Sequence, residues 1–401
     1  MSHVTIRTDS ELEQFCQQLV KAEWIALDTE FVAERTYRPQ LCLVQVATAD
    51  EMAIIDPLAV TDMRPFWEAL SQPGHETIVH AGRGEVEFCL RAVGRRPAGL
   101  FDVQIAAGLV GLEYPAAFNT LLSRLLGAAL PKLETRTHWA RRPLTRRQIQ
   151  YALDDVRHLS ALRHRLHQRL EALGRLAWME EEMALWQEAI QAAVAEQRWR
   201  RISGISGLDP RGLAVARELW RWRDAVARRR DRPPRRVLRD DLIVELARCK
   251  TTDIQRIRAL RGLERGDLAR QLPAISQCIQ RALALPESEL PRTRPNQSVP
   301  QLPVLGQFLY AALTSICRQA QLAPGLVGTP SDVRELVAYR TGLQQASRPP
   351  RLATGWRAEV VGKTFDELLT GRLAIRIDDP LSEHPLVFDR NLDKRGSASE
   401  R

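Results

Sequence analysis

The sequence predicts an α/β domain with a mixed sheet over roughly the first 175 residues, followed by two all-α helical regions. Three short apolar runs rich in β-formers, "WIALD", "LCLVQVA" and "EMAIIDP", follow one another and indicate an antiparallel meander. Strand and helix patterns then alternate, from "TIVHAG" into "GEVEFCLRAV" and from "LFD" into "VQIAAGLVG", which favours an α/β domain. Beyond residue 175 we expect no further strand.

The second half of the chain is predicted to be helical, with two breaks. The sequence "RPP" interrupts one helical run, because proline ends a helix and pushes its predecessor out of the α region. A proline-rich stretch that is poor in large apolar residues marks the clearest linker. We therefore divide the chain into an α/β domain (1–175), a helical connector (176–207), a first helical domain (208–290), a linker (291–302), a second, degenerate helical domain (303–380) and a disordered tail (381–401).

Composition points to a polyanionic partner. The chain of 401 residues has 58 Lys plus Arg against 49 Asp plus Glu, a net charge of +9, and most of the basic excess is arginine, which pairs well with phosphate. A membrane surface is the alternative, but no apolar stretch is long enough for a spanning helix and no signal peptide is evident, so we expect a cytoplasmic protein. The six scattered cysteines are expected to be reduced and mostly buried.

Asp28 and Glu30 stand on either side of Thr29 at the end of the first apolar run. Because alternate residues of a strand face the same side, the two carboxylates are predicted to project together. An isolated pair of this kind can simply point into water at a strand end. The functional interpretation is a shared divalent cation, since Mg²⁺ and Mn²⁺ take oxygen ligands and offset the repulsion between the acids.

Two further segments could complete such a site. Tyr151 and Asp155 lie four residues apart in a helical pattern and share one helix face, whereas Asp154 points about 100° away. Glu85 lies in the first turn of the helix after "TIVHAG", where an acid can also merely complement the positive helix end. Together, four carboxylates and a tyrosine would suit two cations about 3.5–4 Å apart, an arrangement that stabilises both oxygens exchanged in phosphoryl transfer.

These segments carry a recognisable pattern. "LDTEFVAERTYRPQLCLVQVA", "VHAGRGEVEF", "LFDVQIAAGLVG" and "THWARRPLTRRQIQYALDDVRHL" resemble, in order and spacing, the ribonuclease D family of 3′-5′ exonucleases. The resemblance covers about residues 1–175 and implies the ribonuclease H-like fold of the DEDD superfamily. The run beginning "DPRGLAVARELWRWRD" resembles the HRDC helical domain of such nucleases and certain helicases, and the region from 303 resembles, more weakly, a second HRDC copy.

The resemblance implies roles for the acids. Asp28 and Glu30 correspond to the first metal-binding motif and Asp155 to the last acid of the third, while Tyr151 marks the tyrosine subtype, whose phenol orients and helps to deprotonate the attacking water. The implied cofactors are two Mg²⁺ or Mn²⁺ ions, and the implied products are 5′-nucleoside monophosphates. Glu85 departs from the family, which usually has aspartate there, and its extra methylene could displace a metal and misalign the reaction.

An exonuclease must also hold a single-stranded 3′ end with arginines and with aromatic side chains that stack on bases. Phe31 could wedge or stack on the terminal nucleotide, and Trp139 stands beside Arg141 and Arg142. The alternatives are that Phe31 belongs to the core and that Trp139 packs a loop against the sheet. His80 is interpreted as structural or as hydrogen-bonded to the site.

Two other features stay open at this stage. Asp102 matches a recurrent acid of the family but is also well placed as a helix N-cap. The arginine-rich stretch 217–239 is either an RNA-binding surface or a solvated helix face, and its Trp220 and Trp222 should lie about 200° apart, one in the core and one partly exposed.

The leading hypothesis is a 3′-5′ exoribonuclease that matures tRNA precursors and other small structured RNAs by a two-metal-ion mechanism. We expect a monomer that uses no small-molecule cofactor and binds no membrane. The alternatives are a 3′-5′ DNA exonuclease and an RNA-binding protein whose metal site is impaired by Glu85.

Overall fold

The structure, a computed structural model, describes residues 3–130, 137–195, 198–263, 266–291, 301–343 and 348–390. Its N-terminal domain is built on a six-stranded mixed sheet in the order β1-β4-β3-β2-β5-β6. The strands are β1 (Val4–Ile6), β2 (Trp24–Val32), β3 (Gln40–Ala47), β4 (Met52–Ile55), β5 (Glu76–Val79) and β6 (Leu100–Asp102).

The predicted meander is confirmed, because β2, β3 and β4 pair antiparallel in sequence. Strand β5 then pairs parallel to β2, and β6 parallel to β5, as expected for strands joined through helices. The short strand β1, which sequence analysis did not predict, adds to β4 at the edge. Strand β2 therefore lies inside the sheet with neighbours on both sides, a rigid position for the acids that it carries.

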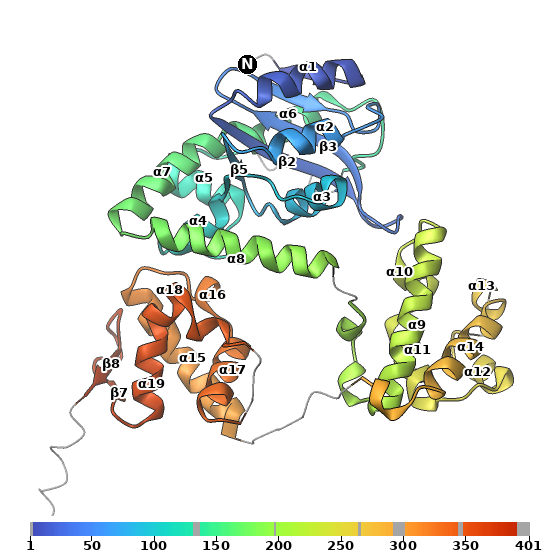
Figure 1. Cartoon of the computed structure of the whole chain (residues 1–401). Coiled ribbons are helices and arrows are strands. Elements are labelled where there is room, and N and C mark those ends of the chain that lie inside the picture. The colour runs from blue at the N-terminus through green and yellow to red at the C-terminus, as the bar shows by residue number, and fades with distance from the viewer. Residues whose placement is uncertain are drawn as a thin grey trace, which may run out of the picture.

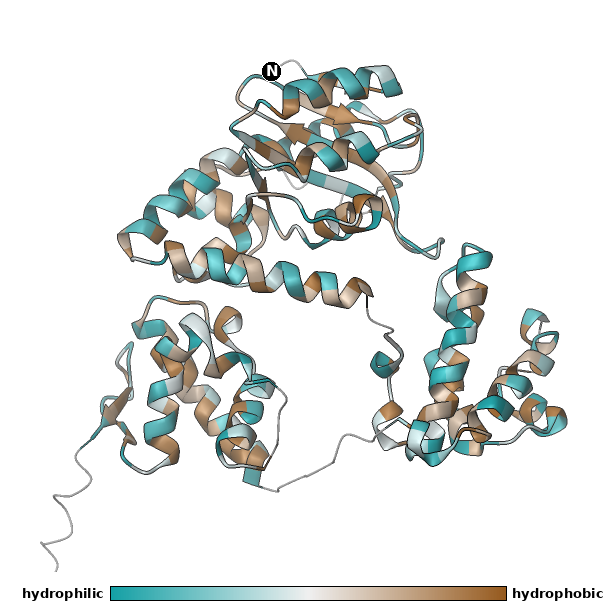
Figure 2. Cartoon of the chain, in the orientation of Figure 1, coloured by the Kyte–Doolittle hydropathy of each residue, from teal (hydrophilic) through white to brown (hydrophobic). Residues whose placement is uncertain are grey.

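Helices cover both faces of this sheet (Figure 1). They are α1 (Asp9–Leu19), α2 (Arg64–Leu70), α3 (Arg83–Val93), α4 (Val103–Leu109), α5 (Phe118–Leu126), α6 (Arg146–Arg157) and α7 (Leu159–Ala172), and α8 (Leu176–Ala195) runs along the base of the domain. Figure 2 shows hydrophobic strands in the interior and helices with hydrophilic residues on their outward faces, the pattern of amphipathic helices packed on a core.

The first helical domain has a hydrophobic core of its own. It follows the short turns η1 (Arg198–Arg201) and η2 (Ile205–Gly207) and contains α9 (Pro210–Arg229), α10 (Pro234–Val237), α11 (Asp240–Cys249), α12 (Ile254–Ala259), α13 (Gly266–Ala269), α14 (Leu272–Leu283) and η3 (Glu287–Glu289). Helix α9 ends before Pro233 and Pro234, as predicted from "RPP". The expectation for Trp220 and Trp222 is wrong, because both indoles are half-buried and pack against the edge of the core.

The C-terminal region contains α15 (Gln301–Gln319), α16 (Pro324–Val327), α17 (Pro330–Arg340), η4 (Arg351–Ala353), α18 (Gly355–Arg357), a π-helical turn (Ala358–Gly362) and α19 (Lys363–Leu369). The prediction that no strand follows residue 175 is wrong, since β7 (Ala374–Ile377) and β8 (Leu386–Asp389) form a hairpin. Strand β8 also lies within the tail predicted to be disordered, of which residues 391–401 fall outside the described part. Most of the predicted linker, residues 292–300, is likewise outside it.

The C-terminal region shares one continuous core with the α/β domain. Arg175 donates to the backbone oxygens of Leu109 and Gln321, at 2.6 and 2.7 Å, and so ties the two together. The buried Glu182 carboxylate on α8 pairs with Arg357 at 2.5 Å, inside the same junction. Because a buried charge is tolerated only when it is paired, these contacts fix how the C-terminal region docks.

The cysteines are free thiols, and all of them except Cys249 are buried, as predicted. None of the helices in the described ranges combines the length and the apolar character needed to cross a bilayer.

Candidate active site

Three of the predicted acids meet at one place. Asp28 and Glu30 project from β2 and Asp155 from α6, and each offers a carboxylate oxygen within 4.8 Å of the others. Asp28 and Asp155, which are 127 positions apart in the chain, thus lie next to each other in the fold. Hard oxygen donors grouped in this way are suited to a divalent cation.

Local structure explains these orientations. Asp28 and Glu30 pair with Gln45 and Leu43 of β3, and the register shifts immediately after Glu30, where a bulge re-aims the end of the strand. Helix α6 begins with a capping box at Thr145, which fixes its start. Asp154 pairs with Arg157 at 2.8 Å, so of the two adjacent aspartates only Asp155 faces the cluster, as predicted.

The cluster is electrostatically crowded. Burial, and then the charges of Asp28, Asp155 and Glu85, raise the pKa of Glu30 to about 9. Burial also raises the pKa of Asp155 to about 7, although the neighbouring Tyr151 phenol opposes this. The pKa of Asp28 is raised by burial and by Asp155. Acids held so close together favour either shared protons or a bound cation.

Glu85 lies beside this group and is not part of it. It is buried in the first turn of α3, where the Thr29 hydroxyl donates to its carboxylate at 2.5 Å. Thr29 lines the same two cavities as Asp28, so its hydroxyl holds the Glu85 carboxylate next to the clustered acids. Burial and then the charge of Asp28 raise the pKa of Glu85 to about 8, so Glu85 lies within electrostatic range of Asp28.

Asp102 holds the turn that precedes Glu85. Its carboxylate caps α4 through the backbone N–H of Gln104 at 2.8 Å, so the N-cap prediction is confirmed. The same carboxylate accepts from the backbone N–H groups of Ala81 and Gly82, at 3.1 and 3.0 Å. Ala81 has a left-handed φ of 55°, a strained conformation that these bonds help to hold. Asp102 therefore positions the start of α3.

Two cavities open at the acids. The first, which we call the acid cavity, has a volume of about 350 Å³ and includes Glu30, Tyr151 and Asp155. The second, the aromatic cavity, has a volume of about 390 Å³ and includes Phe31, Glu85 and Phe88. Asp28, Thr29 and His80 line both, so the two cavities meet at the end of β2.

The structure separates the alternatives for two of the predicted binding residues. The Phe31 side chain is 42% exposed and meets Phe88 edge-on at 5.7 Å between ring centroids, so it is not a core residue. The Nε2 atom of His80 lies 2.9 Å from the backbone oxygen of Ala116, which agrees with its interpretation as a hydrogen-bonded structural residue. Both side chains still line the aromatic cavity.

The loop that carries Trp139 forms another cavity, of about 700 Å³, with Tyr151 in its wall. Trp139 is only 8% exposed and packs on Tyr151 at 6.1 Å between centroids, so the structure favours its packing alternative. Arg142 is bound to Asp56 at 2.6 Å and to the backbone oxygen of Cys42. The exposed Arg141 is the predicted residue of this loop that stays available for a ligand.

Sequence analysis missed Thr29, Phe88 and Asp56 as parts of the site. Thr29 was visible between the two acids, but strand alternation directed attention to its neighbours. Phe88 stands one helical turn after Glu85, a spacing that could have placed both on one side of α3. No local signal links Asp56 to Arg142, 86 positions away.

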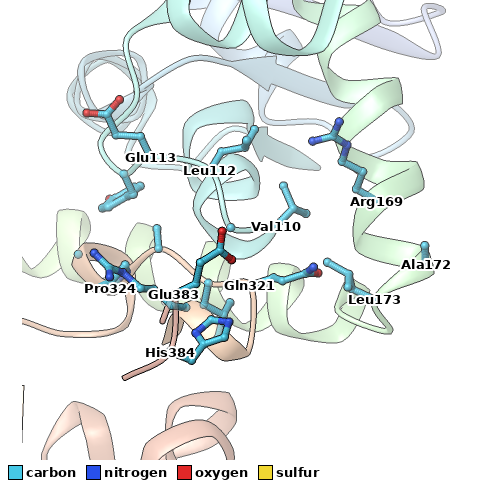
Figure 3. A pocket seen from close by; sticks show the side chains of 16 residues that line it. Val110, Leu112, Glu113, Arg169, Ala172, Leu173, Gln321, Pro324, Glu383 and His384 are labelled. Carbon is cyan, nitrogen blue, oxygen red and sulfur yellow. The ribbon is translucent and has the colours of Figure 1, made fainter. Parts of the chain in front are cut away.

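A larger cavity lies elsewhere. It measures about 940 Å³ and lies between the loop after α4, helix α7 and the C-terminal region, with Arg169, Glu383 and His384 around it (Figure 3). Its lining includes none of the clustered acids. The clustered acids therefore belong to the smaller cavities around Asp28.

Comparison with known proteins agrees with this geometry. The chain matches the 3′-5′ exonuclease family over residues 3–171 and the HRDC domain family over residues 212–279. It is 33% identical to ribonuclease D of Gluconacetobacter diazotrophicus over 94% of this chain and 95% of that protein. For ribonuclease D of Escherichia coli, the identity is 32% over 92% of this chain and 99% of that protein.

The crystal structure of Escherichia coli RNase D, described as an exoribonuclease involved in structured RNA processing, is similar in fold. It matches with a TM-score of 0.83 and 31% identity, covering 92% of this chain and 99% of that chain. These similarities confirm the predicted fold class, a mixed-sheet exonuclease domain followed by an HRDC helical region.

Proposed function

The chain belongs to the ribonuclease D family of 3′-5′ exoribonucleases, and we propose that it hydrolyses RNA from a single-stranded 3′ end with two divalent cations. The observation that carries this proposal is the convergence of Asp28, Glu30 and Asp155. By analogy with the structured RNA processing ascribed to the Escherichia coli relative, tRNA precursors and other small structured RNAs are the proposed substrates.

The residues present fit a cation. Three carboxylates within 4.8 Å offer oxygen ligands to Mg²⁺ or Mn²⁺, and positive charge would offset the burial and the neighbouring acids that raise the pKa of Glu30. Asp28 lines both the acid cavity and the aromatic cavity, where Glu85 also lies. We propose that Asp28, Glu30 and Asp155 hold one cation and that Asp28 and Glu85 hold the other.

Two cations bound there would supply charge stabilisation for the attacking and leaving oxygens of in-line hydrolysis. Tyr151, in the wall of the acid cavity, is proposed to orient the attacking water and to assist its deprotonation. Trp139, packed on Tyr151, keeps the phenol in place. The product is a 5′-nucleoside monophosphate, and no covalent intermediate with the enzyme is required.

Substrate contacts are assigned to the walls of the cavities. Phe31 is placed to stack on the terminal base, with Phe88 supporting it from behind. His80 borders both cavities and would contact the terminal nucleotide. Arg141 is exposed beside Tyr151 and suits a phosphate.

The test is hydrolysis of 3′-labelled and 5′-labelled single-stranded RNA with Mg²⁺ or Mn²⁺, compared with a DNA of the same sequence. We expect mononucleotide release from the 3′ end of RNA and none in the presence of a chelator. Faster hydrolysis of DNA would favour the DNA exonuclease alternative.

The non-catalytic alternative makes a separate prediction. If the chain is an RNA-binding protein whose metal site has decayed, neither the wild type nor Glu85→Asp will hydrolyse RNA, although both will bind it. A monomeric state and a cytoplasmic location remain predictions.

A further inference from the structure

The loop between β2 and β3, residues 33–39, reaches out of the nuclease domain toward α9 and α10 of the first helical domain (Figure 1). At its end, the Tyr37 hydroxyl donates to Asp224 at 2.8 Å, and the Tyr37 backbone N–H donates to Asp231 at 3.1 Å. We call Tyr37, Asp224 and Asp231 the latch. They join residues 187 and 194 positions apart.

The latch is more than a pair of hydrogen bonds. The Tyr37 ring packs against a small apolar cluster on the helical domain, formed by Val226, Ala227, Val237 and Trp222. The guanidinium of Arg228 lies 5.8 Å from the ring centroid, within range of a cation–π contact. Apolar, polar and cationic contacts thus all converge on one half-buried loop residue, which docks the two domains at this point.

Docking encloses a groove of about 740 Å³ between the two domains. Its lining contains six arginines and one acid, Asp224 of the latch: the arginines are Arg38, Arg91, Arg221, Arg223, Arg228 and Arg229. We call this the arginine groove. Four of these arginines pair with carboxylates, but no ion pair with the described residues engages Arg38 or Arg229. These two are the side chains best placed to receive phosphates.

The arginine groove continues into the site. Pro39 and Arg91 line both the groove and the aromatic cavity, which in turn shares Asp28 with the acid cavity. The surface therefore offers an arginine-lined stretch, then an aromatic pocket, then the clustered carboxylates. This order matches a single-stranded RNA, whose phosphates lie along the strand and whose terminal nucleotide lies at the reacting end.

We infer that Tyr37 is a positioning residue, which docks the first helical domain so that the arginine groove guides the RNA strand behind the reacting 3′ nucleotide. This inference rests on the proposed exoribonuclease function. Six arginines against one carboxylate favour RNA over an acidic protein segment, because guanidinium groups pair bidentately with phosphate. The lining of the groove includes none of the clustered acids, so we expect the groove to serve long substrates only.

Substrate length supplies the first experiment. A diribonucleotide can occupy the acid and aromatic cavities, whereas an RNA of roughly 12 nucleotides, within the span of single-strand binding sites, can also enter the groove. Tyr37→Phe removes only the latch hydroxyl, and Tyr339→Phe on α17 is the matched control. We expect Tyr37→Phe to lower kcat/KM for the longer RNA by about tenfold or more, the effect of one lost hydrogen bond to a charged carboxylate. Hydrolysis of the diribonucleotide should be unchanged.

RNA binding, measured by fluorescence anisotropy of the longer RNA in a chelator, supplies the second experiment. Each phosphate contact contributes about 0.7 to the slope of log affinity against log salt for a single strand. The double variant Arg38→Ala with Arg229→Ala should therefore flatten this slope by about 1.4. Arg258→Ala, an exposed arginine on α12 outside the groove, should leave it unchanged.

The possible outcomes of the two experiments distinguish the inference from its alternatives. Equal losses on both substrates would mean that Tyr37 acts through β2 on the chemistry, and no loss on either would mean that docking is irrelevant; both overturn the inference. An unchanged salt slope in the arginine double variant, with RNA still bound, would place RNA elsewhere and also overturn it. If the wild type hydrolyses neither substrate, the proposed function fails, while the binding experiment still decides the role of the groove.

Discussion

The hydrogen bond from Thr29 to Glu85 makes a specific prediction about metal binding. Thr29→Val keeps the shape of the side chain but removes the hydroxyl that donates to the Glu85 carboxylate at 2.5 Å. Both side chains are buried, so water cannot readily replace the lost donor. The Glu85 carboxylate would then have no side-chain hydrogen-bond donor. Glu85 is also one methylene longer than the aspartate usual in the family, so it depends more on such a donor for its orientation.

The size of the effect depends on the charge of Glu85. Burial and Asp28 raise its pKa to about 8 while the Thr29 hydroxyl lowers it, so without a cation this side chain is largely protonated at neutral pH. A neutral hydrogen bond contributes about 0.5–1.5 kcal/mol, and one to a charged group about 1.5–3 kcal/mol. We therefore expect Thr29→Val to cost about 1 kcal/mol of folding stability without metal. The metal-bound state should lose more, corresponding to a roughly 10-fold to 100-fold weaker affinity.

Calorimetric titration of the full chain with Mn²⁺ measures this loss, and urea unfolding in a chelator measures stability. Thr29→Ser, which keeps the hydroxyl, is the matched control and should bind Mn²⁺ like the wild type. In a Glu85→Asp background the shorter carboxylate should depend less on Thr29, so a double-mutant cycle should show coupling between the positions. If Thr29→Val binds Mn²⁺ as tightly as Thr29→Ser, the proposed role of Thr29 in orienting Glu85 is refuted.

Three further predictions concern the remaining residues of the site. Asp28→Ala or Asp155→Ala should abolish RNA hydrolysis without unfolding the protein, and wild-type rates with an intact circular dichroism spectrum would contradict the site. Tyr151→Phe should lower kcat while Mn²⁺ affinity by calorimetry stays close to that of the wild type. Burial raises the pKa of Asp56, but the hydrogen bonds and charge of Arg142, together with the Leu58 backbone N–H, outweigh burial, so the net pKa lies below its ordinary value. Its stabilising effect is present above about pH 4 and is lost as pH falls through the depressed folded pKa. Asp56→Asn should thus cost about 1–3 kcal/mol in urea unfolding near pH 7 and little near pH 2; an equal cost at both pH values would refute the ion pair.

The parts of the fold that sequence could predict are those with a strong local signal. The meander of β2, β3 and β4 follows from consecutive apolar runs. The strand and helix periods predict which acids share a face within one element, whereas the meeting of Asp28, Glu30 and Asp155 in one site was implied by the resemblance to ribonuclease D. Strands β7 and β8 were missed because they are short and half-exposed, without the alternation that a buried face imposes.

Other features could not have been predicted because they depend on how elements far apart in the sequence pack against one another. The side of β2 on which Glu85 lies is set by how α3 packs, and periodicity within α3 does not contain that information. The docking of Tyr37 on Asp224 joins residues 187 positions apart. The half-buried state of both Trp220 and Trp222 reflects two neighbours, since one side of α9 packs in its own domain and another side receives Tyr37.

The site also shows why the acids are carried by this strand. Burial raises the pKa of all three carboxylates, and the charge of Asp155 adds to this at Asp28 and Glu30. Such a group destabilises the segment that holds it together, and an edge strand or a loop could relieve the repulsion by moving apart. Strand β2 cannot move in this way, because β3 and β5 pair with it on either side. Its apolar residues Ile25, Ala26 and Leu27 are also fully buried. The hydrophobic core therefore holds the acids in a repulsive arrangement that a cation would relieve, so metal binding should stabilise the folded chain by mass action.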